Sequence, residues 1–258
     1  MAKTGSGDVP DTVQTAETLF DIVQCVKSGQ GKTVTEVANE LDYVKSTVHR
    51  HLHTLEELGY LVQRADGYHV GLRFLDLGVT ARNSHTGYKL IREKVEEVAE
   101  TTGERAQFFV EEHGEAVYLA RSVGENAVRT DPGLGSRIPL YASSAGKAML
   151  AKMPEPMLFD YIEQVEFEQL TPNTITDSEV LLAEIEKIQE RGYSFNRQET
   201  LRGTHAVGVA VGDSNGGAIG AVSVTGPSHR LKGDRFENQL PDLLLGAANE
   251  LELNIAFS

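Results

Sequence analysis

The 258-residue sequence contains a single cysteine, Cys25, which excludes an intrachain disulfide and a cysteine-based zinc site. No apolar run approaches 18 residues, so the sequence predicts no membrane span. The first ten residues are polar and lack the apolar segment of a signal peptide. We therefore expect a cytoplasmic protein in which Cys25 is a small core residue of a helix.

Basic residues are also scarce. Lys and Arg number 24 against 38 Asp and Glu, which gives a net charge of −14, and this balance is unusual for a nucleic-acid-binding protein. The acidity is unevenly distributed, because residues 1–75 carry a charge of −3 and residues 76–258 carry −11. Residues 44–55 contain Lys45, Arg50 and three histidines but no acid. The acidic excess suggests a halophilic protein, whose surface carboxylates maintain solubility.

Three short helices are predicted in the first 60 residues. The first carries apolar residues at helical spacing and ends at a glycine-rich turn. The second begins at Thr33, where Glu36 three residues later completes a capping box. The third spans residues 44–58, and Gly59 is suited to end it. The apolar residues of the three helices are Ala16, Leu19, Phe20, Val23, Val26, Val34, Val37, Ala38, Leu41, Val48, Leu52, Leu55 and Leu58.

Two short strands, residues 60–64 and 68–70, follow these helices. They flank Asp66 and Gly67, a dipeptide that is typical of a β-hairpin turn. Three helices followed by a hairpin, with only a short turn between the second and third helices, predict a winged helix-turn-helix.

The rest of the sequence predicts an α+β domain. Residues 72–81 form a broadly apolar helix that either packs in a core or links the two domains and packs between subunits. A helix is expected over residues 88–102, ending at Gly103. Beyond it, strands and helices alternate, which predicts a mixed sheet flanked by helices. Expected strands are 106–111, 116–121, 193–196, 206–211 and 218–224, and expected helices are 143–152, 177–191 and 234–253, the last kinked at Pro241.

The third helix carries the candidate DNA contacts, because the N-terminal part of a recognition helix enters the major groove. Side chains with donors for phosphates and base edges gather there. Two threonines at the start of the preceding helix suit phosphate contacts, and an arginine in the hairpin can reach the adjacent backbone. The DNA-binding candidates are Lys45, Ser46, Thr47, His49, Arg50, Thr33, Thr35 and Arg64.

Several motif-like stretches do not predict other chemistry. His49 and His53 share a helix face, but no third ligand accompanies them, so no metal site is expected. Gly31-Lys32-Thr33 lacks the upstream glycine of a phosphate-binding loop. Ser144 to Lys147 matches the S-x-x-K nucleophile motif of serine β-lactamases, yet the companion motifs are missing or misplaced. Gly133-Leu134-Gly135 does not extend to a dinucleotide-binding fingerprint. We therefore expect no cofactor and no enzymatic activity.

From about residue 12 to residue 254, the sequence resembles the IclR-type transcriptional regulators. Several separate stretches carry the resemblance in the order in which the family has them. These stretches are residues 45–50 (KSTVHR), 71–78 (GLRFLDLG), 114–119 (GEAVYL), 139–147 (PLYASSAGK), 170–176 (LTPNTIT), 191–193 (RGY) and 223–227 (SVTGP).

This resemblance implies a GAF-like effector-binding domain, dimers that often pair into tetramers, and effectors that are small organic acids, aromatic acids or sugar-derived metabolites. The resemblance places the effector next to a loop that leads into a helix. Two strand regions and two hydroxyl groups complete the implied site. Hydroxyl and N–H groups at a helix start suit an anion or a polyol. The implied effector-binding residues are Ala142, Ser143, Ser144, Ala145, Gly146, Asn196, Gly203, His205, Ala206, Ser223 and Thr225.

The sequence departs from the family pattern at two positions. Asn196 stands where the family usually has Asp, and His205-Ala206 where it often has Arg-Cys. Losing a carboxylate and a thiol changes the polarity of the site, so the identity of the effector does not follow from the resemblance. The acidic composition is similar to that of haloarchaeal members of the family.

The predicted organisation is a flexible N-terminus (1–11), a DNA-binding domain (12–71), a linker helix (72–87) and a GAF-like effector-binding and oligomerisation domain (88–258). We expect a regulator of a catabolic pathway that binds a promoter operator as a homodimer or a dimer of dimers, modulated by a small metabolite. Two alternatives remain at this point. One is a constitutive DNA-binding protein whose second domain only oligomerises, and the other is a serine hydrolase using Ser144 and Lys147.

Overall fold

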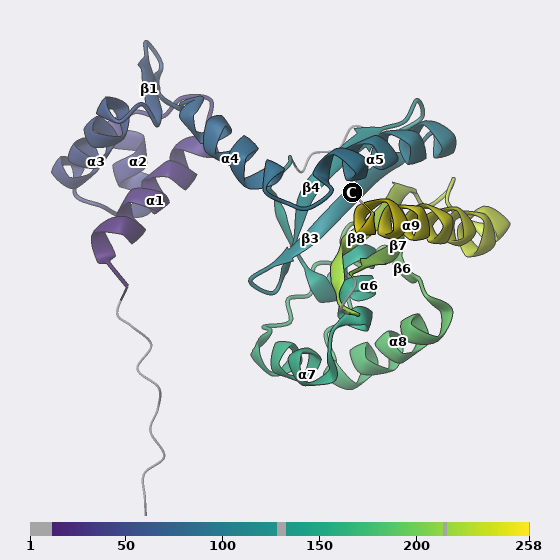
Figure 1. Cartoon of the computed structure of the whole chain (residues 1–258). Helices are drawn as coiled ribbons and strands as arrows, with labels where there is room; N and C mark the ends of the chain where they lie inside the picture. Colours follow the sequence, from purple (N-terminus) through teal and green to yellow (C-terminus); the bar gives the residue numbers. More distant parts are fainter. Residues whose placement is uncertain (1–11, 128–132, 214–215, 258) are drawn as a thin grey trace, which may run out of the picture. The chain divides into compact units, whose positions relative to one another are not determined.

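The computed structural model describes residues 12–127, 133–213 and 216–257 (Figure 1). The chain divides into two compact units that meet between Ala81 and Arg82. The segment 1–11, predicted to be a flexible N-terminus, lies outside the described residues. None of the helices in the described part of the chain is long and apolar enough to cross a membrane.

The first unit has the predicted order of three helices and a hairpin. Its core is a single apolar cluster in which Ile22, Val37, Val48 and Leu52 are fully buried. The wing adds Leu61 to this core. The elements are α1 (Gln14–Lys27), α2 (Val34–Leu41), α3 (Lys45–Glu57), β1 (Leu61–Arg64), β2 (Gly67–Val70) and α4 (Arg73–Asn83).

Local chemistry fixes the ends of these helices. Thr33 and Glu36 form the predicted capping box, in which the Thr33 hydroxyl accepts from the Glu36 N–H and the Glu36 carboxylate accepts from the Thr33 N–H. Asp42 ends α2 in the left-handed conformation, which turns the chain sharply toward α3. The backbone of Lys32 pairs with that of Tyr68, so the wing is held against the start of α2.

The second unit contains a six-stranded sheet and its helices. The predicted helix over residues 88–102 is α5 (Tyr88–Thr102). The strands are β3 (Arg105–Glu112), β4 (Glu115–Val123), β5 (Arg137–Pro139), β6 (Ser194–Arg197), β7 (Thr204–Gly212) and β8 (Ala218–Pro227). The remaining helical segments are η1 (Leu140–Ala142), α6 (Ser144–Lys152), α7 (Glu155–Gln164), α8 (Ser178–Arg191), the π-helical η2 (Arg235–Gln239) and α9 (Leu240–Ala256).

The sheet has the strand order β5-β4-β3-β8-β7-β6, and all pairings among the described residues are antiparallel. The expectation of a mixed sheet was therefore wrong. Alternating strands and helices suggested a crossover between parallel neighbours. Instead, the strands on either side of α6 to α8 are β5 and β6, which lie at opposite edges of the sheet and do not pair.

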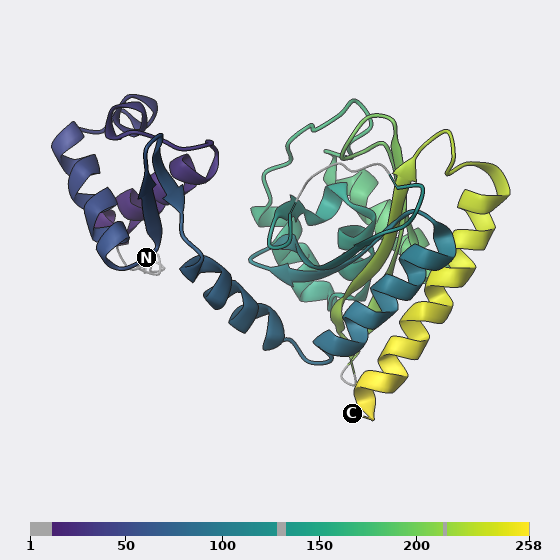
Figure 2. The same ribbon diagram turned by 90° about the horizontal axis from the view of Figure 1, so that it is seen from above.

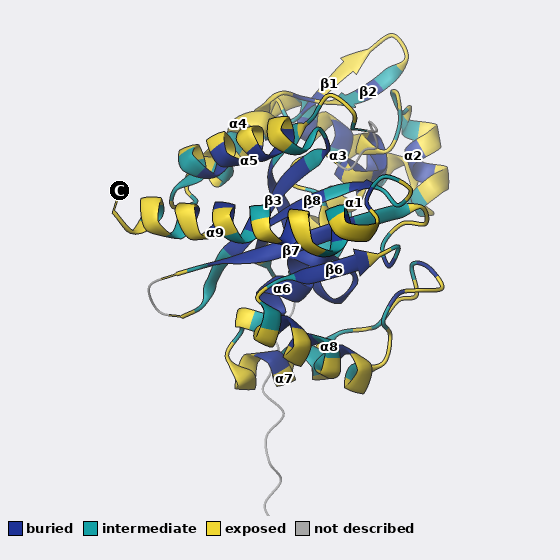
Figure 3. Ribbon diagram, turned by 90° about the vertical axis from the view of Figure 1, so that its right-hand side faces the viewer, coloured by how far each residue is buried: buried dark blue, intermediate teal, exposed yellow. Residues whose placement is uncertain are grey.

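The two faces of the sheet are covered differently. Helices α5 and α9 lie side by side on one face, over a core that includes Phe108, Val207 and Val224 (Figure 2). Helix α6 covers the other face and packs with α8 over a second core that includes Phe109 and Ala221. Figure 3 shows the strands as buried and the outer surfaces of α8 and α9 as exposed. Both faces of the sheet are thus covered by helices.

Candidate DNA-binding surface and ligand cavity

Helix α3 separates a buried face from a basic and polar face. Val48, Leu52 and Leu55 face the core of the first unit. The opposite face of the helix is exposed. On this face the rings of His49 and His53 stack with their centroids 6.4 Å apart. The exposed residues of this surface are Lys45, Ser46, His49, Arg50 and His53, and Thr47 is half-buried. The predicted candidates on α3 thus lie together on one surface.

The DNA-binding candidates outside α3 differ in whether their side chains are free to contact DNA. Thr35, in the first turn of α2, and Arg64, at the tip of the wing, are both exposed. The Thr33 side chain is committed to its capping box, since its hydroxyl also donates to the Glu36 carboxylate at 2.7 Å. The Thr33 hydroxyl is therefore occupied, and Thr33 can contribute to DNA binding only by stabilising the N-terminal end of α2. Among the described residues, no group of three His, Cys, Asp or Glu side chains converges as metal ligands.

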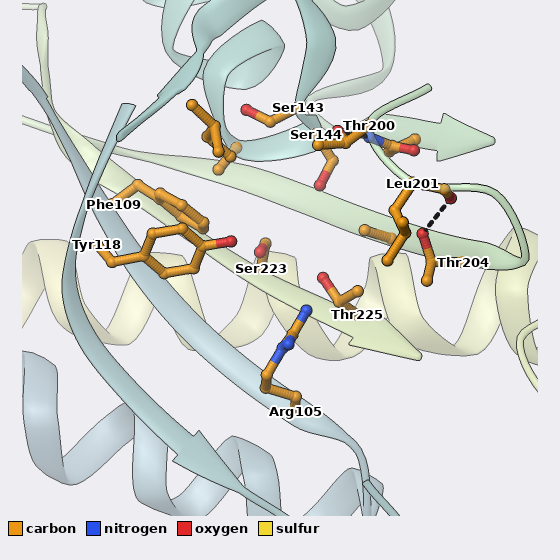
Figure 4. A pocket seen from close by; sticks show the side chains of 14 residues that line it. Arg105, Phe109, Tyr118, Ser143, Ser144, Thr200, Leu201, Thr204, Ser223 and Thr225 are labelled. Carbon is orange, nitrogen blue, oxygen red and sulfur yellow. Dashed lines mark hydrogen bonds between the residues drawn. The ribbon is translucent and has the colours of Figure 1, made fainter. Parts of the chain in front are cut away.

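A cavity of about 130 Å³ lies between the sheet and the start of α6 (Figure 4). Strand register explains which residues share it, because cross-strand partners point to the same side of a sheet. Thr225 pairs with both Arg105 and Ala206, and Ala206 pairs with Asn196. The described lining residues are Arg105, Phe109, Tyr118, Ile138, Ser143, Ser144, Ala145, Asn196, Thr200, Leu201, Thr204, Ala206, Ser223 and Thr225.

Helix α6 approaches the sheet closely enough to form one wall. A Cβ atom on Gly208 would lie 2.6 Å from the backbone carbonyl carbon of Ser144, so only glycine permits this contact. Ser143 caps the helix, and its hydroxyl accepts from the Gly146 N–H at 2.9 Å. The hydroxyl of Ser194 on β6 donates to the carbonyl of Ser144. The N-terminal end of α6 is thereby fixed against the cavity.

Residues 198–203, here called the covering loop, close the cavity from the side of β6. Asn196 holds this loop with its amide: Nδ2 donates to the Ala142 carbonyl at 2.7 Å and to Thr200 Oγ1 at 2.8 Å. The Asn196 Oδ1 atom accepts from the Glu199 N–H at 2.9 Å. The Thr200 hydroxyl in turn donates to the Ala142 carbonyl. Both ends of the Asn196 amide are used, which a carboxylate at this position could not reproduce because it has no donor.

Seven of the residues implied by the resemblance line this cavity, and four do not. Ala142 lies just outside it and offers its carbonyl to Asn196 and Thr200. Gly146 serves packing, because a Cβ atom there would lie 2.2 Å from the Leu140 carbonyl oxygen. The N–H of Gly203 donates to Gln198 within the covering loop. The seven that line the cavity are Ser143, Ser144, Ala145, Asn196, Ala206, Ser223 and Thr225.

His205 is the fourth, and it requires a correction. Its ring stacks on Phe236 with centroids 4.7 Å apart, and its Nδ1 atom lies 2.7 Å from the Leu231 carbonyl oxygen. Successive residues of a strand point to opposite faces. Since Ala206 faces the cavity, His205 faces the α9 side and is a packing residue.

The family models identify the chain at this point. The IclR helix-turn-helix domain matches residues 15–65, and the model described as bacterial transcriptional regulator IclR C-terminal matches residues 83–252. The chain belongs to the IclR family. It is therefore a DNA-binding transcription regulator, and α3 lies within the residues that the helix-turn-helix model matches.

IclR-family relatives match over nearly the whole chain. The protein named "Probable HTH-type transcriptional regulator ArcR" from Halobacterium salinarum is 31% identical over 250 residues, which is 95% of each chain. The solved structure of Thermotoga maritima IclR is 28% identical, covers 93% of this chain and 98% of its own, and has a TM-score of 0.79. An IclR homologue from Microbacterium hydrocarbonoxydans, solved with 4-hydroxybenzoate, shares the fold at 21% identity and a TM-score of 0.77, covering 95% and 100% of the two chains.

Membership of the IclR family also decides against the serine hydrolase alternative, because these relatives are named transcriptional regulators. The contacts of Lys147 also argue against a serine hydrolase. The Lys147 ammonium forms a buried ion pair with the Glu199 carboxylate. A lysine engaged by a carboxylate in this way is poorly placed to take a proton from Ser144.

Among the lining residues that were not predicted from the sequence, three lie on the neighbouring strands β3 and β4. Arg105 and Phe109 lie on β3, and Tyr118 lies on β4 opposite Phe109, with ring centroids 4.2 Å apart. Burial raises the pKa of the Tyr118 hydroxyl, and the nearby guanidinium groups of Arg105 and Arg121 act in the opposite direction. Tyr118 therefore stays a neutral hydroxyl that can donate or accept a hydrogen bond.

Proposed function

We propose that this IclR-family regulator controls genes of a catabolic pathway, and that a small metabolite in the cavity between α6 and the sheet changes its affinity for an operator. The observation that carries the proposal is the cavity itself, which is closed by the covering loop and lined by polar side chains from five strands and a helix start. Concave sites with a few convergent polar groups are typical of small-molecule binding. The homologue solved with 4-hydroxybenzoate supports an effector in this fold.

The operator is proposed to contact α3, the start of α2 and the wing. Lys45 and Arg50 reach phosphates or guanine edges, and Ser46, Thr47 and His49 bond to bases or backbone. Thr35 and the N-terminal end of α2, capped by Thr33, approach a phosphate, as helix N-termini do. Arg64 reaches the flanking backbone from the wing.

The active form is proposed to be a homodimer, or a pair of dimers, on a pseudo-palindromic site. Helix α4 has no buried residue within the chain, and three leucines around it are largely exposed. Phe20 on α1 is exposed as well. Apolar side chains exposed on consecutive turns favour contact with a second copy. The exposed leucines are Leu72, Leu75 and Leu77.

The response to the effector is proposed to be a population shift. The effector favours one arrangement of the subunits, and α4 carries that preference to the spacing of the two α3 helices. Helix α4 suits this role because it joins the wing directly to the second unit. An effector without differential affinity for the two arrangements would change nothing.

Genome-wide occupancy of the tagged protein tests the regulator and its pathway together. Wild type and Arg50→Ala are compared with Arg92→Ala, an exposed arginine on α5, as the matched control. Discrete promoter peaks that disappear only in Arg50→Ala support the recognition surface, and the neighbouring genes indicate the pathway. Peaks that are unchanged in Arg50→Ala contradict that surface. Operator affinity that is insensitive to every ligand that stabilises the protein would instead favour a constitutive regulator.

A further inference from the structure

The C-terminal end of α3 is joined to α4 by a compact set of contacts. The chain leaves α3 at Leu58, forms the wing and returns at Gly71, so α4 begins beside the residues that end α3. The Gly71 N–H donates to the Tyr60 carbonyl at 2.7 Å. A Cβ atom on Gly71 would lie 2.8 Å from the Gly59 carbonyl oxygen and 2.9 Å from that of Tyr60. The two segments therefore approach as closely as their backbones permit, which requires a residue without a side chain.

Two consecutive side chains of α4 contact the Tyr60 ring. The Phe74 ring packs on it with centroids 4.9 Å apart, and the Arg73 guanidinium lies over it at 5.0 Å from its centroid. Tyr60 and Phe74 are both half-buried and pack against the core of the first unit. Because neighbouring residues of a helix point about 100° apart, these two contacts restrain α4 from two directions.

Arg73 also binds the end of α3 itself, since its Nη1 atom donates to the Leu58 carbonyl. The last turn of a helix has carbonyls without helical partners and a partial negative charge. The last turn of α3 contains Glu56 and Glu57 and no basic residue, so α3 does not supply a compensating positive charge. Arg73 supplies this charge from the next helix and thereby ties the ends of the two helices together.

A small change of angle at this joint is large at the other end of α3. The helix has 13 residues and is therefore about 20 Å long. A tilt of about 10° at Leu58 would displace the N-terminal end of α3 by about 3.5 Å, which is close to the rise of one base pair of DNA. The candidate DNA contacts Lys45 and Arg50 lie toward that end, so the joint controls where they meet the duplex.

The exposure of Arg73 distinguishes it from a core residue. Arg73 is exposed, whereas Phe74 is half-buried. Because exposed charges contribute little to folding stability, the first unit is expected to stay folded without Arg73, with Phe74 still packed on Tyr60. A single ring contact leaves α4 free to turn about the Tyr60 ring. Arg73 therefore restrains an angle more than it stabilises the fold.

We propose that Arg73 is a positioning residue that fixes α4 to the C-terminal end of α3, and that it thereby determines how strictly the protein reads the spacing between two half-sites. This inference rests on the proposed function, in which α4 contacts a second copy and α3 contacts the operator. In that assembly the placement of each α3 relative to the second copy passes through the joint, so a loose joint accepts several spacings.

The test measures binding of the full-length protein to the operator found by occupancy mapping, with one base pair removed from or added to its centre. Wild type is expected to lose affinity by about tenfold or more at either altered spacing, because one base pair also rotates a half-site by about 35° around the duplex. Arg73→Met is expected to differ by less than about threefold among the spacings. Its affinity for the native spacing should fall by about three- to tenfold, since a loose joint must be ordered on binding.

Two further variants separate position from charge. Arg73→Lys keeps the positive charge at the end of α3 and is expected to restore most of the strictness for spacing. Arg92→Met on α5, which removes an exposed arginine outside the joint, is the matched control and is expected to behave as wild type.

Spin labels test the joint without DNA. Thr54→Cys on α3 and Thr80→Cys on α4 are labelled in a Cys25→Ala background, since both positions are exposed. Labelled chains are diluted with unlabelled chains, so that only distances within one chain are measured. Pulsed electron paramagnetic resonance is expected to give a narrow distribution of distances in the otherwise unchanged protein and a broader one when Arg73→Met is added.

Three results would overturn the positioning role alone. One is an Arg73→Met variant that is as strict for spacing as a strict wild type. Another is a distance distribution of unchanged width. The third is an equal loss of affinity on a duplex with a single half-site, which would make Arg73 a direct DNA contact. A wild type that tolerates every spacing would instead contradict the proposed dimeric reading of the operator, and the spacing role with it, so the two failures are distinguishable.

Discussion

Lys147 on α6 and Glu199 in the covering loop form an ion pair whose side chains are only 1% and 8% exposed. The pair joins the helix that walls the cavity to the loop that covers it. The hydroxyls of Thr171 and Thr174 donate to the Glu199 carbonyl and anchor the same residue from another side. The loop is thereby fixed by charge as well as by the Asn196 amide.

Removing one partner of this pair is expected to be costly. Lys147→Met leaves the Glu199 carboxylate buried without its counter-charge, and we expect a loss of about 3–5 kcal/mol of unfolding free energy. The double variant Lys147→Met/Glu199→Leu should recover most of that loss, because no buried charge remains. Urea denaturation measures both, with Lys152→Met, an exposed lysine of the same helix, as control. A double variant as unstable as the single one would show that the charge is not the cause.

The close packing of α6 on β7 predicts that an added methyl group destabilises the protein there, whereas the same change at a control glycine should stabilise it. Gly208→Ala places a Cβ atom against the Ser144 and Ala145 backbone, and we expect a loss of about 1–3 kcal/mol from overpacking. In Gly246→Ala, on the exposed side of α9, the added atom meets nothing within 4 Å, so stability should rise by about 0.5–1 kcal/mol. Thermal and urea denaturation measure the change in stability of both variants. A neutral Gly208→Ala would mean that α6 is able to shift.

The salt dependence of operator binding tests the phosphate contacts. Each phosphate contact contributes about −0.9 to the slope of log affinity against log salt concentration. Lys45→Gln should therefore make the slope shallower by about one for each copy bound. Lys89→Gln on α5, with a side chain that is 82% exposed, is the matched control. Fluorescence anisotropy between 50 mM and 400 mM salt measures the slopes, and equal slopes for Lys45→Gln and wild type would place Lys45 away from the phosphates.

The leucines around α4 give a prediction about assembly. Leu75 is 60% exposed within one chain, so Leu75→Glu should leave a single chain folded. If the helix packs against a second copy, the buried charge should weaken dimers by at least tenfold, as measured by sedimentation velocity over a range of concentrations. Asp76→Asn on the same helix is the control. An unchanged dimer would place the interface elsewhere.

Acid should destabilise the second unit through Glu237. Two hydrogen bonds from Arg197, both 3.0 Å long, lower the pKa of the Glu237 carboxyl below its ordinary range. A carboxyl with a lowered folded-state pKa contributes stability above its unfolded pKa, and this contribution is lost as the pH falls through the folded value. The difference in melting temperature between wild type and Arg197→Met should thus be largest at neutral pH and shrink as the pH falls through the lowered pKa of Glu237. Parallel profiles over the whole range would contradict the linkage.

Sequence patterns predicted most helices and strands of both units, because their apolar spacing and end signals are local. Residues 88–102 were predicted with the bounds of α5, and Thr33 with Glu36 as a capping box. Helix α7 was not predicted, since Pro154 and Pro156 break the local signal and only Leu158 in it is buried. Strand β5 is three residues long and depends on pairing with β4.

The candidate ligand site was predicted less completely, for a topological reason. Alternation along β3 places Arg105 and Phe109 on one face, but both faces of the sheet are covered by helices. Only the pairing of β3 with β8 reveals that this face meets Ser223 and Thr225. His205 and Ala206 are adjacent on a strand, so alternation alone already forbids placing both in one cavity.

The sheet of the second unit is a single layer, with α5 on one face and the cavity on the other. A ligand there never touches α5, the first helix after the segment that leads from the DNA-binding unit. Neighbouring residues of β3 meet different partners. Arg105 lines the cavity, Gln107 donates to the lining hydroxyls of Ser223 and Thr225, and Phe108 packs in the core with Ile91 and Val95 of α5. The proposed effector response therefore has a direct route through the thickness of one strand, because β3 contributes both to the cavity lining and to the core beneath α5.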